Sequence, residues 1–173
     1  ILSRGENGMS GKYEDRVNVS KSIFEGCGIS KDNIFIFNIP DTKFIDRRRK
    51  VFNAIEKVCV EFAISRIYTH TAKEYHQDHI VVHEESLRAA RNVPSILLYE
   101  SNAHTYPTFN PVYFRDITKY VNRKVTFVQA HQTQKEKKYC DPEVILAHSK
   151  FRGHQSRTSA HAEAFEVIRL VQS

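Results

Sequence analysis

Two histidines and an aspartate stand close together in the segment His76-Gln77-Asp78-His79. A neutral imidazole nitrogen binds zinc well, and a metal-bound histidine usually directs its other ring nitrogen at a carboxylate or a carbonyl. The segment contains both kinds of group. The same spacing also suits a loop followed by a helix, in which Asp78 accepts the unpaired backbone N–H groups of the first helical turn. Spacing alone therefore leaves metal chemistry and a capped helix both open.

The elements expected around this segment indicate where it lies in the fold. Apolar spacing and turn residues predict helices and strands in alternation: helices at 13–27, 46–62, 79–91 and 117–131, and strands at 34–37, 66–70 and 95–100. Such alternation is typical of βαβ units and a parallel sheet. Ligands of open parallel sheets bind beyond the carboxyl ends of the strands, and the histidine segment directly follows the strand 66–70. We therefore expect an α/β fold with the histidines at its ligand-binding edge.

Composition restricts the class of protein. The 173 residues are 40% hydrophobic and 27% charged, which suits one globular domain with a sizeable core. The net charge is +6, but the basic residues are scattered apart from the run 47–50, so we expect a solvated helix face there and no nucleic-acid partner. No stretch approaches the roughly 20 apolar residues of a membrane span. Three cysteines in no paired spacing, Cys27, Cys59 and Cys140, favour reduced thiols and a cytoplasmic location.

Several blocks resemble, in order along the chain, those of the LmbE/PIG-L deacetylases. The resemblance runs through nearly the whole sequence and is carried by LSRGENG at 2–8, NIPDTKF at 38–44, YTHTAKEYHQDH at 68–79, LLYES at 97–101, FNPVYFRDITKYVNRKV at 109–125, AHQTQ at 130–134 and AEAFEVIR at 162–169. Agreement of many blocks is far more specific than the HQDH string alone. The resemblance implies a Rossmann-like three-layer fold with a mostly parallel sheet, over residues 1–173 as a single deacetylase domain.

The resemblance also implies a chemistry and roles for the histidine segment. It implies one zinc ion per chain, with His79 as a metal ligand. His76 and Asp78 are then catalytic: His76 as a charged or acidic helper beside the metal, and Asp78 as the carboxylate that orients and tunes a histidine. The reaction is hydrolysis of a linear amide by metal-activated water, which removes an acetyl group from an N-acetylated amino sugar or its glycoconjugate.

Three further residues are candidates for binding the substrate. Arg16 matches the arginine that follows the first strand and loop in the LmbE/PIG-L family. Asp41 follows a predicted strand, where it is well placed for sugar hydroxyls, although Pro-Asp is also an ordinary turn pair. His131 in AHQTQ is a candidate for facing the pocket, and a helix cap is the alternative. The loop 101–110 is where we expect substrate specificity.

The sequence also departs from the family pattern. The family's HPDDE motif, which carries two further metal ligands and the general base, is not among these 173 residues. We expect it, with the first strand, upstream of Ile1, and we expect the 173 residues by themselves to be inactive. Gln77 replaces the usual proline, which changes the turn and not the metal binding. Val19 stands where the family often has glutamate, which leaves the local partner of Arg16 open.

Two other classes of protein share features of this sequence pattern. A dinucleotide-binding domain needs a GxGxxG turn after its first strand, and the early glycine cluster at residues 4–11 does not provide it. A non-catalytic sugar-binding or partner protein on the deacetylase scaffold is the stronger alternative. The sequence is compatible with several N-acetyl sugars as the substrate. It is compatible with a monomer and with a homo-oligomer.

Overall fold

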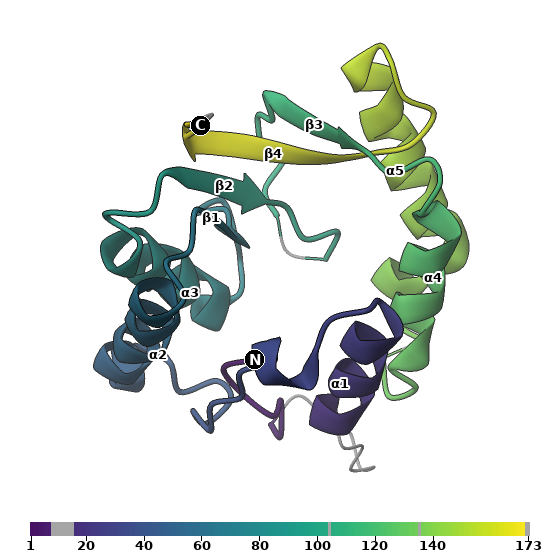
Figure 1. Ribbon diagram of the computed structural model, residues 1–173. Helices are drawn as coiled ribbons and strands as arrows, with labels where there is room; N and C mark the ends of the chain where they lie inside the picture. The colour runs from purple at the N-terminus through teal and green to yellow at the C-terminus, as the bar shows by residue number, and fades with distance from the viewer. Residues whose placement is uncertain (8–15, 104, 135, 172–173) are drawn as a thin grey trace. The chain divides into compact units, whose positions relative to one another are not determined.

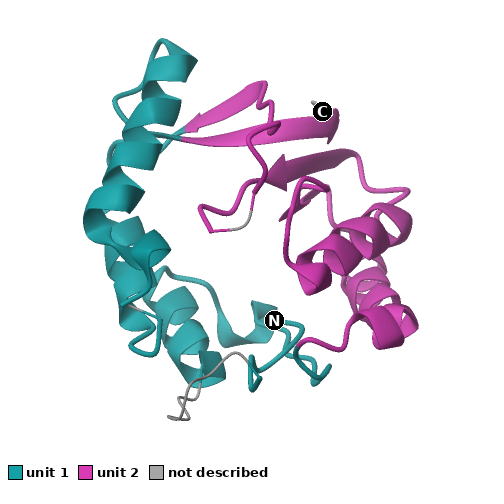
Figure 2. Cartoon of the chain, turned by 180° about the vertical axis from the view of Figure 1, so that it is seen from behind, with its two compact units in different colours: residues 1–41, 116–162 teal, residues 42–115, 163–173 magenta. Residues whose placement is uncertain are grey.

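The chain divides into two compact units. The computed structural model describes residues 1–7, 16–103, 105–134 and 136–171. Unit 1 comprises Ile1–Asp41 and Asp116–Ala162, and unit 2 comprises Thr42–Arg115 and Glu163–Ser173 (Figure 2). Each unit is therefore built from two separate stretches of chain.

Unit 2 holds the sheet and two helices (Figure 1). The two units divide at the end of β3 and at the start of β4. The elements of unit 2 are the 3₁₀ turn η2 Ile45–Arg47, α2 Arg48–Glu61, β1 Arg66–His70, α3 Gln77–Ala89, β2 Ser95–Tyr99, β3 Tyr113–Asp116 and β4 Ala162–Arg169. The strand order is β1-β2-β4-β3. Strands β1 and β2 are parallel, whereas β2 and β4 are antiparallel. The sheet is therefore mixed.

The core of unit 2 lies between this sheet and its helices. Strand β2 is nearly inaccessible along its length, with Leu97 fully buried, as expected for a strand paired on both sides. Helices α2 and α3 pack against each other, and α3 packs on β1. Cys59 of α2 meets Ala90 and Val93 at the end of α3, together with Ile96 and Leu98 of β2. This packing fixes α3, and with it the side chains at its start, against the carboxyl end of β1.

Unit 1 is built from helices and extended loops. Its elements are α1 Arg16–Gly26, η1 Lys31–Asn33, α4 Val121–Ala130, η3 Lys138–Cys140 and α5 Pro142–Ser156. Helix α5 begins with a side-chain cap, because Asp141 accepts the N–H of Glu143 and Pro142 occupies the first turn. The expected strand 34–37 is a half-buried extended segment whose backbone bonds to Ile1, since Ile1 donates to Phe35 and accepts from Phe37.

The α/β fold expected from the sequence is confirmed. Strands β1 and β2 and helices α1 to α4 fall where the pattern predicts them, although residues 13–15 of the first expected helix lie outside the described residues. The sequence pattern did not predict α5, β3 or β4, and β4 makes the sheet mixed. Among the residues that the structure describes, no helix has the length and apolar character to cross a bilayer.

Candidate metal centre and active site

The candidate site begins where β1 and β2 end. His70 and Tyr99 are the last residues of these parallel strands and lie opposite each other in the sheet register. The Tyr99 hydroxyl lies 2.9 Å from His70 Nε2. Burial, with the negative charge of Glu74, raises the pKa of Tyr99, so its hydroxyl stays neutral and can accept the Nε2–H of His70, the tautomer that leaves the Nδ1 lone pair free. The carboxyl edge of the sheet thus carries an ordered histidine.

The start of α3 brings more histidines to the same edge. His76 caps the helix: its backbone is extended and its Nδ1 accepts the N–H of Asp78 at 3.2 Å. Because Nδ1 accepts a hydrogen bond, the neutral ring carries its proton on Nε2. His76, His79 and His83 follow one another at helical spacing, which places them on one side of α3. His83 Nδ1 lies 2.8 Å from the carbonyl oxygen of His70 and so joins α3 to β1.

A buried carboxylate holds the central histidine. Glu74, in the turn between β1 and α3, is 1% exposed, and its Oε2 lies 3.0 Å from His79 Nδ1. The His79 ring stacks on His70 at a centroid distance of 3.9 Å and on His76 at 4.6 Å. Two stacking contacts and one hydrogen-bond contact at the ring edge restrict the plane of the His79 ring. A carboxylate on one ring nitrogen is the usual support of a histidine that binds metal through the other.

His70, Glu74 and His79 form a candidate metal group. Each offers one nitrogen or oxygen, and these atoms lie within 4.8 Å of one another. Burial, and then the neighbouring histidines, lower the pKa of His70 to about 3, so its ring is neutral and keeps a lone pair for a metal. His70 Nδ1 is buried and has no hydrogen-bond partner among the described residues. Two imidazoles and a carboxylate are a donor set that zinc prefers. The residues present therefore fit a divalent ion.

Asp78 supports a loop next to the histidines. Its buried carboxylate accepts the N–H of Thr42 at 2.7 Å and of Phe44 at 3.3 Å, and the Gln77 side chain donates to the Thr42 carbonyl. Thr42 has a φ of 62°, which is strained for a β-branched residue and is held by these bonds. The sequence assigned Asp78 to orienting a histidine, but the carboxylate that the structure places against an imidazole ring is Glu74. The catalytic role of Asp78 stays a prediction.

The loop after β2 is tied to the same turn. The Thr105 hydroxyl donates to Glu74 Oε1 at 3.1 Å and accepts the N–H of Ser101 at 2.7 Å. Lys73 and Glu166 of β4 form an ion pair, and Glu166 also accepts hydrogen bonds from Thr71 and from the N–H of Asn110. Burial opposes ionisation of Glu166, but these donors outweigh it and lower the pKa of Glu166. The expected specificity loop is thus fastened at both ends.

Three predicted substrate-binding residues belong to unit 1. Arg16 is the first residue of α1, and its guanidinium lies so close to Gly5 that a Cβ there would come within 2.6 Å of it. The backbone N–H of Asp41 donates to Glu6, and its carbonyl accepts from Asn7. Residues 5–7 therefore contact both Arg16 and Asp41. His131 is the half-buried C-cap of α4, which is the alternative that the sequence left open for it. The substrate-binding assignments of all three stay predictions.

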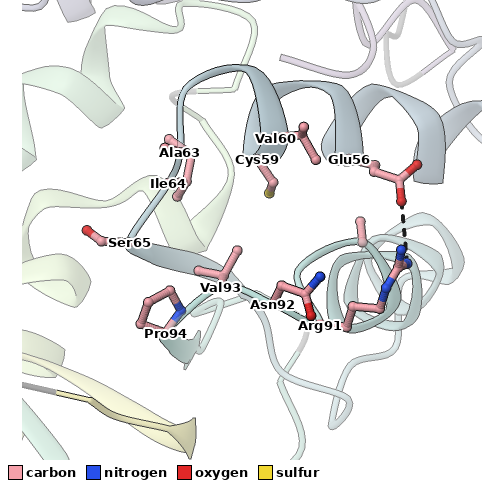
Figure 3. Close-up of a pocket in the computed structure, with 11 residues that line it drawn as sticks. Glu56, Cys59, Val60, Ala63, Ile64, Ser65, Arg91, Asn92, Val93 and Pro94 are labelled. Atoms are coloured by element: carbon pink, nitrogen blue, oxygen red, sulfur yellow. Dashed lines mark hydrogen bonds and ion pairs between the residues drawn. The ribbon is translucent and has the colours of Figure 1, made fainter.

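A pocket of about 380 Å³ lies at the other end of the strands (Figure 3). It is lined by the end of α2 and by the segments that lead into β1 and β2, including Ser65 and Pro94. Its charged pair, Glu56 and Arg91, is joined in an ion pair 3.4 Å long. Because ligands of such sheets bind at carboxyl ends, this pocket is not the candidate active site.

Sequence reasoning missed two members of the metal group. No motif argument in the sequence singles out His70, and Glu74 belongs to no short motif. Both lie in the family-like block 68–79, which was used only for its last four residues. A carboxylate five residues before the candidate metal ligand His79 is the signal that the sequence offers.

The fold and the site define an α/β protein with a histidine and carboxylate cluster at the carboxyl edge of its sheet. The chain belongs to the PIG-L family, whose model, described as GlcNAc-PI de-N-acetylase, matches residues 1–90. It is also 27% identical over 142 residues to a protein described as the uncharacterized deacetylase YaiS of Escherichia coli (strain K12), a match that covers 77% of this chain and 73% of that protein. The family is thus one of deacetylases.

Solved structures share the fold at low sequence identity. GalB, the 4-carboxy-2-hydroxymuconate hydratase of Pseudomonas putida KT2440, matches with a TM-score of 0.78 and 19% identity over 100% of this chain and 85% of that one. The N,N'-diacetylchitobiose deacetylase of Pyrococcus horikoshii matches with a TM-score of 0.77 and 16% identity over 96% of this chain and 70% of that one. The conserved protein TT1542 of Thermus thermophilus matches with a TM-score of 0.74 and 19% identity, over 99% and 81% of the two chains. These matches confirm the fold.

Proposed function

We propose that this protein is a zinc-dependent deacetylase that hydrolyses the N-acetyl group of an amino sugar or its glycoconjugate. Membership of the PIG-L family supports the deacetylase class. The sugar is supported by the family description, GlcNAc-PI de-N-acetylase, and by the fold match to a chitobiose deacetylase. The observation that carries the proposal is the Glu74–His79 contact beside His70, because it provides the ordered imidazole that a hydrolytic metal needs.

His79 is the metal ligand in this proposal, as the sequence predicted. Its Nδ1 faces Glu74, so Nε2 is the nitrogen directed to the ion. Glu74 supports His79 from the other ring nitrogen, and His70 offers a second imidazole beside it. A bound zinc ion would supply a Lewis acid that polarises the acetyl carbonyl and lowers the pKa of water. The protein's own part is to hold the His79 ring in place, by its stacking on His70 and by the Glu74 carboxylate on Nδ1, so that Nε2 would be presented to the ion.

His76 acts on the amide rather than on the ion. Its Nδ1 is engaged by the N–H of Asp78, so its Nε2–H is the group that can donate to the carbonyl oxygen as negative charge develops there. The resemblance implies a charged or acidic helper at this position, but a proton on Nδ1 would break the cap bond. We therefore propose a neutral His76 donor, with Asp78 keeping the neighbouring loop in place. Arg16, Asp41 and His131 are proposed to bind the sugar.

The fold alone does not determine the reaction, because the hydratase GalB has a similar fold. The family match favours amide hydrolysis, and a non-catalytic sugar-binding protein remains the alternative. The test is zinc content and acetate release from N-acetylglucosamine, measured on the full-length protein. Release of acetate that stops on chelation and returns with zinc supports the proposal. Sugar binding without acetate release supports the alternative. We propose that the enzyme acts in the cytoplasm on a small-molecule substrate.

A further inference from the structure

Two tyrosine rings lie against each other on the surface of unit 2, beside the candidate site. Tyr75 is 59% exposed and Tyr106 is 40% exposed. Their ring centroids are 4.0 Å apart and the ring planes are inclined by 51°. Tyr75 directly precedes His76, and Tyr106 belongs to the expected specificity loop. Single exposed aromatic residues are common, but a paired aromatic surface at the border of a site provides a place for a ligand.

The two rings are held in place by the backbone on which they stand. Glu74 and Thr105 form an isolated antiparallel bridge. The N–H of Tyr106 donates to the carbonyl of Lys73 at 2.8 Å, and Lys73 Nζ donates to the carbonyl of Thr108 at 2.8 Å. These bonds join the residues just before Tyr75 to residues 105–108, around Tyr106. The tyrosines therefore form a pre-organised surface, which costs less entropy to fill than a mobile one.

The same surface is connected to the metal group through one carboxylate. Glu74 Oε1 accepts the Thr105 hydroxyl, next to Tyr106, and Glu74 Oε2 contacts His79. The turn that carries Tyr75 also carries Glu74 and His76. The turn and loop that hold the two tyrosines therefore also hold Glu74 and, through it, His79. A molecule bound on the two rings would have a fixed position relative to the candidate metal group.

We propose that Tyr75 and Tyr106 form a platform on which the pyranose ring of the substrate lies. A pyranose has an apolar face of C–H groups and a rim of hydroxyls, and a tyrosine matches it with an apolar ring and a polar tip. Both tyrosines keep a large exposed fraction despite their contact, so each leaves surface that a sugar ring can contact. This inference rests on the proposed function and names the residues that recognise the sugar. A substrate with an acetamide and no sugar ring does not use the platform.

The test compares a sugar with an acyclic amide. Tyr75→Ala and Tyr106→Ala in the full-length protein should each lower kcat/KM for N-acetylglucosamine roughly 10-fold, mainly through KM, because stacking binds ground state and transition state alike. Hydrolysis of N-acetylethanolamine should change less than about twofold. Tyr75→Phe keeps the ring and should retain most of the activity. Tyr120→Ala removes a tyrosine that is 57% exposed in unit 1 and is the matched control.

Binding separates this inference from the proposed function. Saturation-transfer NMR reports whether N-acetylglucosamine binds, whether or not acetate is released. If the wild type binds the sugar and hydrolyses neither amide, the proposed function fails, and loss of binding in Tyr75→Ala still supports the platform. If the tyrosine variants lose kcat/KM equally on the sugar and on the acyclic amide, or lose it on neither, the platform is wrong. Acetate release by the wild type would still support the proposed function in that case. A wild-type protein that binds no N-acetylglucosamine would contradict both.

Discussion

Glu74→Gln is the substitution that most directly examines how His79 is held. The glutamate is 1% exposed, and each of its oxygens has a separate partner, His79 Nδ1 at 3.0 Å and the Thr105 hydroxyl at 3.1 Å. Glutamine keeps the volume but presents one oxygen and one NH₂ group. If the amide oxygen stays on Thr105, the NH₂ group faces Nδ1 of His79. The ring must then move its proton to Nε2, the nitrogen proposed to bind the ion.

The size of the effect follows from these contacts. Loss of a hydrogen bond to a charged group costs roughly 1.5–3 kcal/mol, and loss of a carboxylate behind a metal-bound histidine lowers metal affinity roughly 10–100-fold. We therefore expect Glu74→Gln to bind zinc roughly 10–100-fold more weakly, measured by competition with a chelator, and to unfold at lower urea concentration.

Thr105→Val is the control for this experiment. It removes the other hydrogen bond to the same carboxylate and leaves the contact with His79 in place. It should lower the free energy of unfolding by roughly 1–3 kcal/mol, because the N–H of Ser101 also loses its acceptor. Its zinc affinity should stay within about threefold of the wild type, since a metal-supporting contact is intact. Unchanged zinc affinity in Glu74→Gln would refute the positioning of His79 by Glu74.

Three further predictions concern other parts of the chain. His76→Ala should keep zinc and lower kcat by roughly 10² or more, whereas His76→Asn, which can still cap α3, should restore the stability lost in the alanine variant without restoring kcat; loss of zinc in both would reassign His76 to the metal. Glu166→Gln should destabilise the protein by roughly 1–3 kcal/mol at pH 7. Because the folded pKa of Glu166 is lowered, its stabilisation is complete above an unfolded pKa of about 4.3 and is lost as the pH falls through the folded value, so urea midpoints of wild type and variant should converge in acid; a constant gap would contradict this. Arg169→Lys should cost roughly 0.5–1.5 kcal/mol by urea titration, since the guanidinium donates to several carbonyls after α3 and an ammonium cannot reproduce that fork, and an unchanged midpoint would mean those bonds contribute nothing.

Local patterns predicted the elements that carry the site. Strand β1 has the predicted bounds, and α3 begins two residues before the predicted start because His76, and not a later residue, provides the cap. The hydrophobic period and the turn residues depend only on neighbouring positions in the sequence, so they can predict helices and strands without knowledge of tertiary contacts. The direction of β4 is not a local property, since it depends on which neighbour the strand meets, and the sequence pattern for AEAFEVIR was interpreted only as a family block.

The sequence indicates only part of the candidate site, because some of its residues are brought together only by tertiary contacts. His79 and His76 stand in a recognisable segment, whereas His70 and Glu74 become site residues only through the pairing of β1 with β2 and the turn that returns to α3. The expectation that Asp78 orients a histidine comes from the resemblance to the LmbE/PIG-L family. The helix geometry instead directs Asp78 to the loop at Thr42 and leaves that place to Glu74. Sequence proximity did not determine which carboxylate contacts the imidazole.

The most direct measurement of the central claim is zinc content together with acetate release, on the full-length wild type and on His79→Ala. We predict about one zinc per chain in the wild type, and loss of both tight zinc binding and deacetylation in the variant. Circular dichroism of the variant confirms that the fold is kept. A folded His79→Ala protein with full zinc occupancy and wild-type release of acetate from N-acetylglucosamine would contradict the assignment of this site.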